Sequence, residues 1–122
     1  MNFKNILSIF LMTLAVGLFG TTSIAAESLK IVENEKVCMV TDMHFAKKQI
    51  PVEVEGKTYF GCCQNCKATL SKDATARTAT DPISGKSVDK AKAVIAARSD
   101  NSVVYFENEK NFKEYLKKTS AQ

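Results

Sequence analysis

Two stretches of the chain alternate hydrophobic and polar residues in the manner of β-hairpins. Residues 50–61 place valines on one face and glutamates on the other, and Glu55-Gly56 offers the residue types of a tight turn. Residues 92–106 follow a similar pattern, with a polar turn near 100–101. The pattern predicts two antiparallel hairpins.

Each expected hairpin is followed by a segment with helical periodicity. Residues 62–72 contain neither glycine nor proline and put Cys66 and Leu70 on one face of a helix. Residues 108–118 predict a second helix that ends in lysines, which suit the negative end of the helix dipole. The apolar stripe of this second helix consists of Phe112, Tyr115 and Leu116. We therefore expect an α+β fold built from small hairpin-plus-helix units.

The segments around these elements indicate how the chain divides. Residues 28–40 begin with alternating hydrophobic and charged positions and predict a strand that leads to the first cysteine. Residues 74–80 are small and polar, which predicts a linker, and the Asp-Pro-Ile-Ser-Gly sequence of residues 81–85 favours a turn. We expect one small domain made of a first unit at residues 27–73 and a second unit at residues 81–122.

The two units resemble each other at a shift of 46 residues. Five of the twelve positions in residues 59–70 are identical to their counterparts in residues 105–116. The identical pairs are Tyr59 and Tyr105, Phe60 and Phe106, Asn65 and Asn111, Lys67 and Lys113, and Leu70 and Leu116. The same shift puts Cys66 on Phe112. One pseudo-repeat therefore carries the thiols, and the other fills the corresponding position with the apolar side chain of Phe112. The chain is expected to hold one chemical site.

The N-terminus has the layout of a cleavable export signal. A single early cation, Lys4, precedes a largely apolar run from Ile6 to Phe19, and small residues follow as far as Ala26. This run of fourteen residues is short for a membrane span. We expect a signal peptide at residues 1–26, and a processed protein that is periplasmic or secreted and not embedded in a membrane.

Composition excludes several function classes. The chain has a formal net charge of +4, its charges are of mixed sign, and it has no tryptophan. No basic stripe interleaved with aromatic residues is present, so the sequence gives no support to nucleic-acid binding. His44 is the only histidine, and the neighbouring glutamates Glu53 and Glu55 fall on one strand face as solubilising charges. The sequence supplies no constellation for a hydrolytic enzyme.

Four cysteines give the sequence its candidate chemistry, and three of them lie within residues 62–66. If that segment forms the first turn of a helix, Cys62, Cys63 and Cys66 point into an arc of about 100°. The preceding hairpin doubles back and could bring Cys38 over that arc. Clustered thiols at a helix start suit a soft or borderline metal, and both Zn²⁺ and Cu⁺ accept thiolate ligands.

Two residues near the first cysteine add soft or borderline donors. Met43 offers a thioether and His44 an imidazole, so both are candidate ligands. The competing interpretation of methionine in this stretch is core packing. The competing interpretation of the histidine is an ordinary surface side chain.

The cysteines also allow two interpretations that involve no metal. In an exported chain disulfides are the default, and Cys38 could be stapled to one of the later cysteines. Cys63 and Cys66 have the C-x-x-C spacing of thiol–disulfide exchange proteins, but the chain offers no thioredoxin-like βαβ unit around it. The adjacent pair Cys62 and Cys63 is poorly placed to bridge, because their Cβ vectors diverge.

The cysteine spacing resembles a known family. The pattern Cys38-x23-Cys62-x3-Cys66, with a Gly-Lys-x-Tyr-Phe hairpin arm before it, looks like the TRASH domain. The second unit, from Asp81-Pro82 onward, resembles the related YHS domain. Together the two resemblances cover roughly residues 36–118, nearly all of the expected processed chain.

The resemblance carries expectations about fold and ligands. It implies treble-clef-like units, in which a knuckle, a hairpin and a helix start supply the cysteines. It implies Cys38, Cys62 and Cys66 as ligands, whereas Cys63 is either a fourth ligand or a spare thiol. The YHS-like unit departs from the usual Asp-Pro-Val-Cys-Gly start because Ser84 replaces the cysteine, which indicates that this unit binds no metal.

The residues and the resemblance together predict a soft-metal-binding protein in metal trafficking, resistance or sensing, with one bound Zn²⁺ or Cu⁺. The resemblance implies a metal transporter or efflux component as partner. One alternative is a structural or interaction module stapled by a metal or a disulfide, because small domains with thin cores commonly need such staples. A less favoured alternative is a thiol–disulfide redox protein that uses Cys63 and Cys66.

Overall fold

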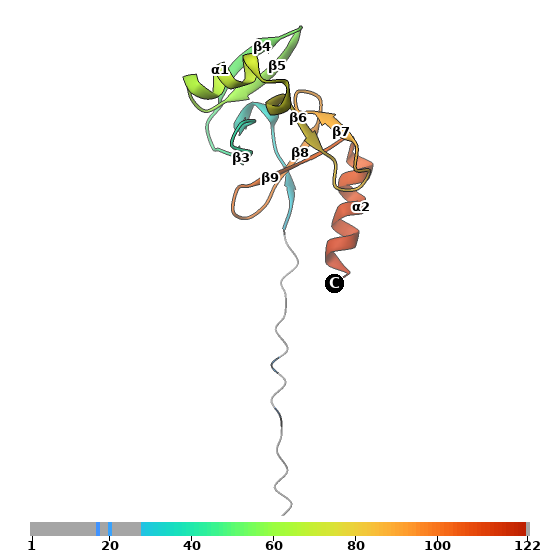
Figure 1. Ribbon diagram of the computed structural model, residues 1–122. Coiled ribbons are helices and arrows are strands. Elements are labelled where there is room, and N and C mark those ends of the chain that lie inside the picture. Colours follow the sequence, from blue (N-terminus) through green and yellow to red (C-terminus); the bar gives the residue numbers. More distant parts are fainter. Residues whose placement is uncertain (1–16, 18–19, 21–27, 122) are drawn as a thin grey trace, which may run out of the picture.

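The computed structural model describes Gly17, Gly20 and residues 28–121. The expected signal peptide therefore lies outside the described residues, apart from those two glycines. The described part has the expected α+β architecture, with a helix at each end of a group of short antiparallel strand pairs (Figure 1). In this part of the chain, no helix combines the length and the apolar character that a membrane crossing requires.

The elements follow the chain in two halves. Those of the first half are β1 (Lys30–Ile31), the 3₁₀ turn η2 (Asn34–Lys36), β2 (Val37–Cys38), β3 (Met43–His44), β4 (Ile50–Val54), β5 (Lys57–Gly61) and α1 (Gln64–Lys72). Those of the second half are the 3₁₀ turn η3 (Ala74–Arg77), β6 (Thr78–Thr80), β7 (Ser87–Asp89), β8 (Val94–Ala97), β9 (Val103–Phe106) and α2 (Glu109–Ser120).

Both predicted hairpins are confirmed. Strands β4 and β5 pair with Val54 opposite Lys57, so that Glu55 and Gly56 form a two-residue turn with φ of 51° and 75°. Two positive φ values are the signature of the type I′ turn that matches the twist of a hairpin. Strands β8 and β9 pair around a loop in which Asn101 has a φ of 68°.

The single strand predicted for residues 28–40 is wrong, because the segment turns in its middle. The 3₁₀ turn η2 separates β1 from β2, with Lys36 N–H donating to the Glu33 carbonyl at 3.0 Å. The two short strands then go to different partners. Strand β1 pairs with β8 and completes a three-stranded sheet in the order β1-β8-β9, whereas β2 pairs with β3.

The segment predicted as a linker, residues 74–80, has regular structure. Asp73 ends α1 and accepts a hydrogen bond from Thr75 N–H, which starts η3. Strand β6 then pairs with β7. The prediction failed because small polar residues are typical of linkers, and nothing local in the sequence shows that β7 will supply a partner strand.

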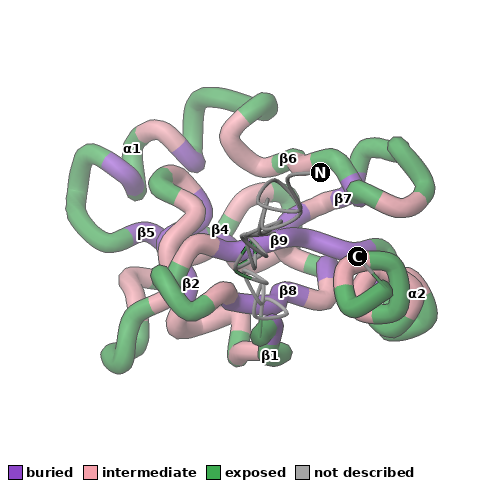
Figure 2. Tube along the Cα trace, turned by 90° about the horizontal axis from the view of Figure 1, so that it is seen from below, coloured by how far each residue is buried: buried purple, intermediate pink, exposed green. Residues whose placement is uncertain are grey.

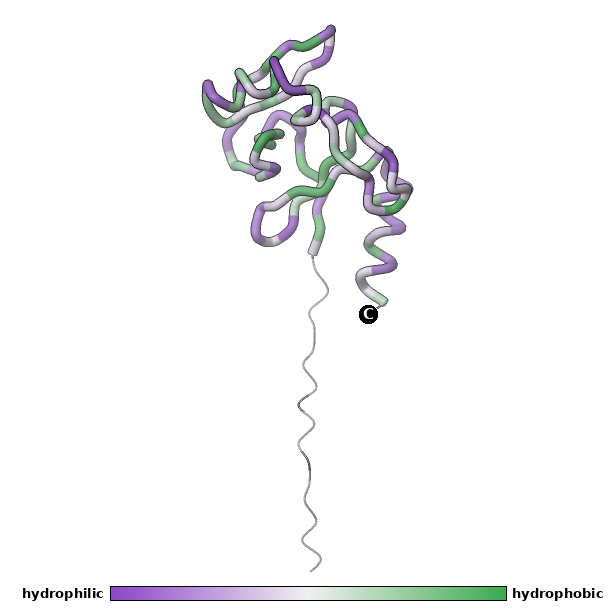
Figure 3. Tube along the Cα trace, in the orientation of Figure 1, coloured by the Kyte–Doolittle hydropathy of each residue, from purple (hydrophilic) through white to green (hydrophobic). Residues whose placement is uncertain are grey.

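The β8–β9 hairpin is buried on both faces and forms the centre of the molecule. All four residues of β9 are buried, as Figure 2 shows along that strand. Figure 3 shows hydrophobic positions gathered in these central strands and a mostly hydrophilic α2. One face of the hairpin packs under α2, where the buried residues are Leu29, Ala96, Val104, Phe106 and Phe112.

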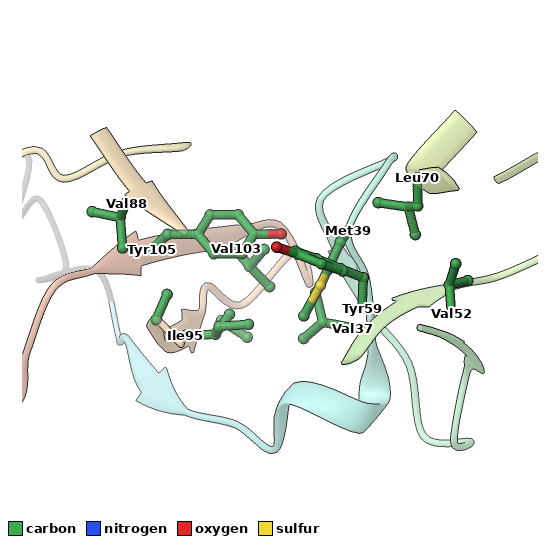
Figure 4. Packing of buried hydrophobic residues seen from close by; sticks show 11 residues of the cluster. Val37, Met39, Val52, Tyr59, Leu70, Val88, Ile95, Val103 and Tyr105 are labelled. Carbon is green, nitrogen blue, oxygen red and sulfur yellow. The ribbon is translucent and has the colours of Figure 1, made fainter. Parts of the chain in front are cut away.

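The opposite face of the same hairpin packs against the first half of the chain. Ile95, Val103 and Tyr105 belong to a cluster that also contains Val37 and Met39 from the first half, as Figure 4 shows. Val52, Tyr59 and Leu70 continue this cluster toward α1. The two halves therefore share one core around the β8–β9 hairpin.

Two reciprocal clusters of polar side chains also join the halves. Tyr59 of the first half donates its hydroxyl hydrogen bond to Asp89 of the second at 2.8 Å, and Tyr105 of the second half donates to Asp42 of the first at 2.7 Å. A lysine completes each cluster, because Lys57 pairs with Asp89 and Lys90 pairs with Asp42 at 2.8 Å. The two tyrosines are counterparts in the 46-residue repeat.

The predicted turn at residues 81–85 is organised by Asp81, whose side chain is fully buried. One carboxylate oxygen accepts from the backbone N–H groups of Ile83 and Ser84 at 2.7 and 3.2 Å. The other accepts from Glu107 N–H at 2.8 Å and from the Asn111 side chain at 2.9 Å. The aspartate therefore ties the turn to the start of α2.

Candidate metal centre

Three of the four cysteines come together from separate elements. Cys38 ends β2, Cys62 follows β5, and Cys66 lies in the first turn of α1. Their sulfur atoms all lie within 4.8 Å of one another, and Cys62 Sγ is 3.5 Å from Cys66 Sγ. All four cysteines are free thiols. The predicted convergence of Cys38, Cys62 and Cys66 is thus present in the structure.

A backbone hydrogen bond brings Cys38 beside the other two cysteines. Met39 N–H donates to the carbonyl of Phe60 in β5 at 2.9 Å. Because Met39 follows Cys38 and Phe60 lies two residues before Cys62, this one bond holds the β2 end against the β5 end. Met39 itself is fully buried in the core cluster, so this methionine is a packing residue.

Gly61 allows β5 to approach α1 closely enough to place Cys62 against Cys66. A Cβ atom at Gly61 would lie 3.0 Å from the Cβ of Cys66 and 3.3 Å from its backbone carbonyl carbon. Such distances are below ordinary van der Waals contact, so a larger residue would push the strand end and the helix apart. The glycine was not singled out from the sequence, where it could be found only by asking which position next to the cysteines tolerates no side chain.

The three sulfurs differ in their exposure. Cys38 is completely buried and Cys66 nearly so, whereas Cys62 is exposed. A metal held among them would therefore be covered by protein on one side and reached by solvent on the side of Cys62. Structural zinc sites are usually closed by four protein ligands, and sites that exchange a ligand keep an open position.

The pKa values of the three thiols diverge. Burial raises the pKa of Cys38, but hydrogen bonds from the Thr41 side chain and backbone, the Val40 backbone and the Cys62 thiol lower it to about 7 overall. Hydrogen bonding to Cys38 and Cys66 raises the pKa of Cys62 to about 12. Burial raises the pKa of Cys66. Cys38 is therefore the thiol that is most readily ionised of these three.

Cys63 has a different role in the structure from the one that a continuous helix would give it. Helix α1 begins at Gln64, and Cys63 is its N-cap with extended backbone angles of −156° and 175°. Its sulfur accepts from Cys66 N–H at 3.4 Å and lies 3.4 Å from Cys66 Sγ. Cys63 is exposed and lies outside the group formed by the other three. The predicted placement of Cys62 and Cys63 inside the helix is wrong, because the helix begins only at Gln64 and Cys63, with its extended backbone, is the cap before it.

Met43 and His44 form β3 and pair with different residues of β2. Met43 pairs directly with Cys38 in the β2–β3 ladder, and opposed residues in such a ladder project to the same face. His44 pairs with Val37 and lines a surface pocket of about 270 Å³ together with residues such as Lys30 and Asn101. Among the described residues, the group that could hold a metal does not include His44.

The loop after Cys38 is held by residues that sequence patterns did not reveal. Asp42 adopts a φ of 54°, which closes the turn between β2 and β3. The buried Lys90 donates to the Met39 carbonyl at 2.6 Å and to the Asp42 carboxylate at 2.8 Å. Lys90 is 51 residues from Met39 along the chain, so only the tertiary structure shows that it supports this loop.

The sulfur positions are compatible with a bound metal ion. A tetrahedral zinc ion with bonds of about 2.3 Å places its sulfur ligands about 3.8 Å apart. The 3.5 Å separation of Cys62 and Cys66 is close to that value, and a group within 4.8 Å needs only small side-chain rotations to reach it. A set of three thiolates binds soft and borderline metals in preference to metals that favour oxygen ligands.

Comparisons with protein-family models, with curated proteins and with solved structures give no match for this chain. The site must therefore be interpreted from its own geometry and chemistry.

Proposed function

We propose that this chain is an exported protein that binds one soft or borderline metal ion, Cu⁺ or Zn²⁺, through Cys38, Cys62 and Cys66. The observation that carries the proposal is the convergence of three free thiols from three elements within 4.8 Å. The protein holds the ion or passes it on, as part of metal trafficking, resistance or sensing.

The uneven burial of the cluster supports transfer over permanent storage. A carrier must give a partner's ligand access to the metal before its own ligands leave. The exposed Cys62 lies on the solvent side of the cluster, opposite the buried Cys38. An incoming thiolate could therefore take the open position beside Cys62 while the buried sulfurs still hold the ion.

The resemblance of the first half to the TRASH domain and of the second to the YHS domain gives this proposal its biological setting. Members of these families are associated with heavy-metal trafficking and resistance. A membrane transporter or efflux component is the partner class that follows from it. The apolar run before Ala26 supports export to the compartment in which such components receive metal.

Native mass spectrometry of the reduced, purified protein tests the proposal. With one equivalent of Zn²⁺ or Cu⁺, we expect a mass increase of a single ion and protection of three thiols from alkylation. Serine variants of Cys38, Cys62 and Cys66 should each lose the tight site. The matched control is Cys63→Ser, which changes a neighbouring thiol outside the group and keeps an N-cap residue. Metal uptake that survives the triple substitution would overturn the proposal.

A purely structural metal is the second candidate, because an ion bound by these sulfurs would cross-link β2, α1 and the segment between β5 and α1. The two candidates differ in what metal removal does to the fold. A carrier keeps its secondary structure and cooperative unfolding after a chelator removes the ion, whereas a stapled module loses them. Circular dichroism before and after chelation separates the two.

A further inference from the structure

We propose that Cys66 serves two chemistries, as a metal ligand with Cys38 and Cys62 and as the partner of Cys63 in thiol–disulfide exchange. Oxidation of Cys63 and Cys66 by a low-molecular-weight disulfide such as glutathione disulfide then releases the metal. This inference rests on the proposed metal site and adds a redox activity that controls it.

The geometry that carries this inference is the position of Cys66 between two other thiols. Its sulfur is 3.5 Å from Cys62 Sγ on one side and 3.4 Å from Cys63 Sγ on the other. Of these two neighbours of Cys66, Cys62 belongs to the group that could hold the metal and Cys63 does not. A disulfide requires an S–S distance of about 2.0 Å, so the sulfurs of Cys63 and Cys66, now 3.4 Å apart, must approach each other further.

The two states of Cys66 exclude each other. A sulfur in a disulfide has no thiolate charge to donate to the metal. Formation of the Cys63–Cys66 bond would therefore leave Cys38 and Cys62 as the two remaining thiols of the group. A site with two thiolates in place of three binds the ion more weakly, so oxidation and metal release are coupled.

Cys63 is the thiol that an incoming disulfide meets first. It is exposed, and it is the cysteine left outside the metal group, so bound metal does not mask its sulfur. The other exposed thiol, Cys62, would be occupied as a ligand. Cys66 is buried and is reached from within the protein by Cys63.

The exchange balances as two successive displacements. The Cys63 thiolate attacks one sulfur of the disulfide RSSR, which forms a Cys63–S–S–R mixed disulfide and releases the first thiolate RS⁻. The Cys66 thiolate, on leaving the metal, attacks Cys63 Sγ, which forms the Cys63–Cys66 bond and releases the second RS⁻. The protein loses two electrons and RSSR gains them, and the two RS⁻ take up one proton from Cys63 and one from solvent.

The test follows zinc release from the purified protein loaded with one equivalent of Zn²⁺. Glutathione disulfide is added, and a chromogenic chelator reports the free ion. We expect release together with a disulfide that peptide mass mapping assigns to Cys63 and Cys66. Cys63→Ser should bind Zn²⁺ equally well and release it at least about tenfold more slowly, because the accessible attacking thiol is gone.

Three results would contradict the inference or the proposed function. Equal release rates from Cys63→Ser and the unsubstituted protein, or a mapped disulfide between Cys62 and Cys66, would overturn the inference and leave the metal site standing. A reduced protein that takes up neither Zn²⁺ nor Cu⁺ would refute the proposed function itself, and coupled release with it. Cys62→Ser serves as the opposite control, since it should form the Cys63–Cys66 disulfide whether or not Zn²⁺ is present.

Discussion

Of the three clustered thiols, Cys38 is the one whose pKa the fold lowers. It is fully buried, yet hydrogen bonds from Thr41, Val40 and Cys62 more than offset the effect of burial on its pKa, which falls to about 7. The loop that follows the cysteine therefore provides a preformed place for a thiolate. In the proposed function, metal binding would begin from one ionised sulfur, and the other two thiols would lose their protons when the ion arrives.

This difference among the thiols predicts a change in proton release with pH. Above pH 7 Cys38 is already ionised, so a metal should displace about two protons, those of Cys62 and Cys66; below pH 7 it should displace about three. Affinity therefore rises with pH throughout, and more steeply on the acid side of 7. Calorimetric titration with Zn²⁺ in buffers of different ionisation enthalpy counts these protons.

One outcome of this proton count would contradict the prediction. If three protons are released on both sides of neutral pH, Cys38 is an ordinary thiol in the free protein. Cys63→Ser is the suitable control, because it leaves the three proposed ligands in place and should give the same counts as the unsubstituted protein.

Gly61 gives a second test at the scale of one atom. We expect Gly61→Ala to destabilise the fold by about 1–3 kcal/mol, since its Cβ overpacks against Cys66. The variant should also bind Zn²⁺ more weakly, because the strain is relieved by moving Cys66 away from Cys62. Urea unfolding and competition with a metal indicator measure the two effects. Ala68→Ser changes an exposed residue of α1, the helix that carries Cys66, and should alter neither the stability nor the Zn²⁺ affinity.

At the scale of elements, the starts of the two helices show what the repeat conserves and what it changes. The second helix is capped by Asn108, whose side chain accepts from Asn111 N–H, and the first by Cys63. The 46-residue shift places Asn108 on Cys62, so in this alignment α2 begins one residue earlier than α1. The position that caps the helix in the second half is therefore occupied in the first half by Cys62, which lies outside the helix and belongs to the group with Cys38.

The elements that sequence predicted well are those fixed by local chemistry. The Glu55-Gly56 turn and the apolar periodicity of 108–118 each determine an element by themselves, and both are found where expected. The convergence of Cys38, Cys62 and Cys66 also followed from spacing and a doubled-back hairpin. Strands β3, β6 and β7 were missed because each has only two or three residues and owes its conformation to a distant partner.

The site details that sequence did not provide depend on the same kind of distant contact. The helix period placed Cys63 with the other thiols, whereas its extended backbone makes it a cap. No pattern along the chain connects Lys90 to the loop after Cys38. Such contacts are set by the packing of the two halves and become visible only in the folded molecule.

Asp81 offers a test of an element boundary that is remote from the cysteines. Asp81→Asn should cost about 2–3 kcal/mol of stability, because the amide replaces an oxygen that accepts from buried donors with a nitrogen that cannot accept. Zinc affinity should be unchanged, since Asp81 supports the start of α2. Urea unfolding and metal competition, measured on one preparation, check both expectations.

The pH dependence of this effect has a definite sign. Burial raises the pKa of Asp81, but its four hydrogen-bond donors hold that pKa below the usual value of 3.8. The carboxylate therefore contributes its full stabilisation above pH 3.8 and loses it as the pH falls further. Asp81→Asn should lack this acid-dependent loss, and an unchanged acid limb in the variant would contradict the assignment.

At the scale of the whole molecule, the halves are joined through one hydrophobic sheet and two polar clusters. The β8–β9 hairpin presents one face to α2 and the other to the first half, so neither half has a complete core alone. The reciprocal Asp–Tyr–Lys clusters lie at this junction. The Asp42 cluster reaches the loop that follows Cys38, so the second half supports the three-cysteine group without contributing a cysteine to it.

This arrangement predicts that Lys90 affects metal binding without touching a sulfur. Lys90→Met removes the donor to the Met39 carbonyl and to Asp42, and leaves a buried carbonyl without that partner. We expect Zn²⁺ affinity to fall about 10- to 100-fold, as happens when residues that orient metal ligands are lost. The matched control is Lys57→Met in the reciprocal cluster, which removes the ion pair and hydrogen bond between Lys57 and Asp89. Competition titrations measure the Zn²⁺ affinity of both variants. Equal affinities would mean that the second half serves only to complete the core. A loss confined to Lys90→Met would show that the second half positions the cysteines that bind the ion.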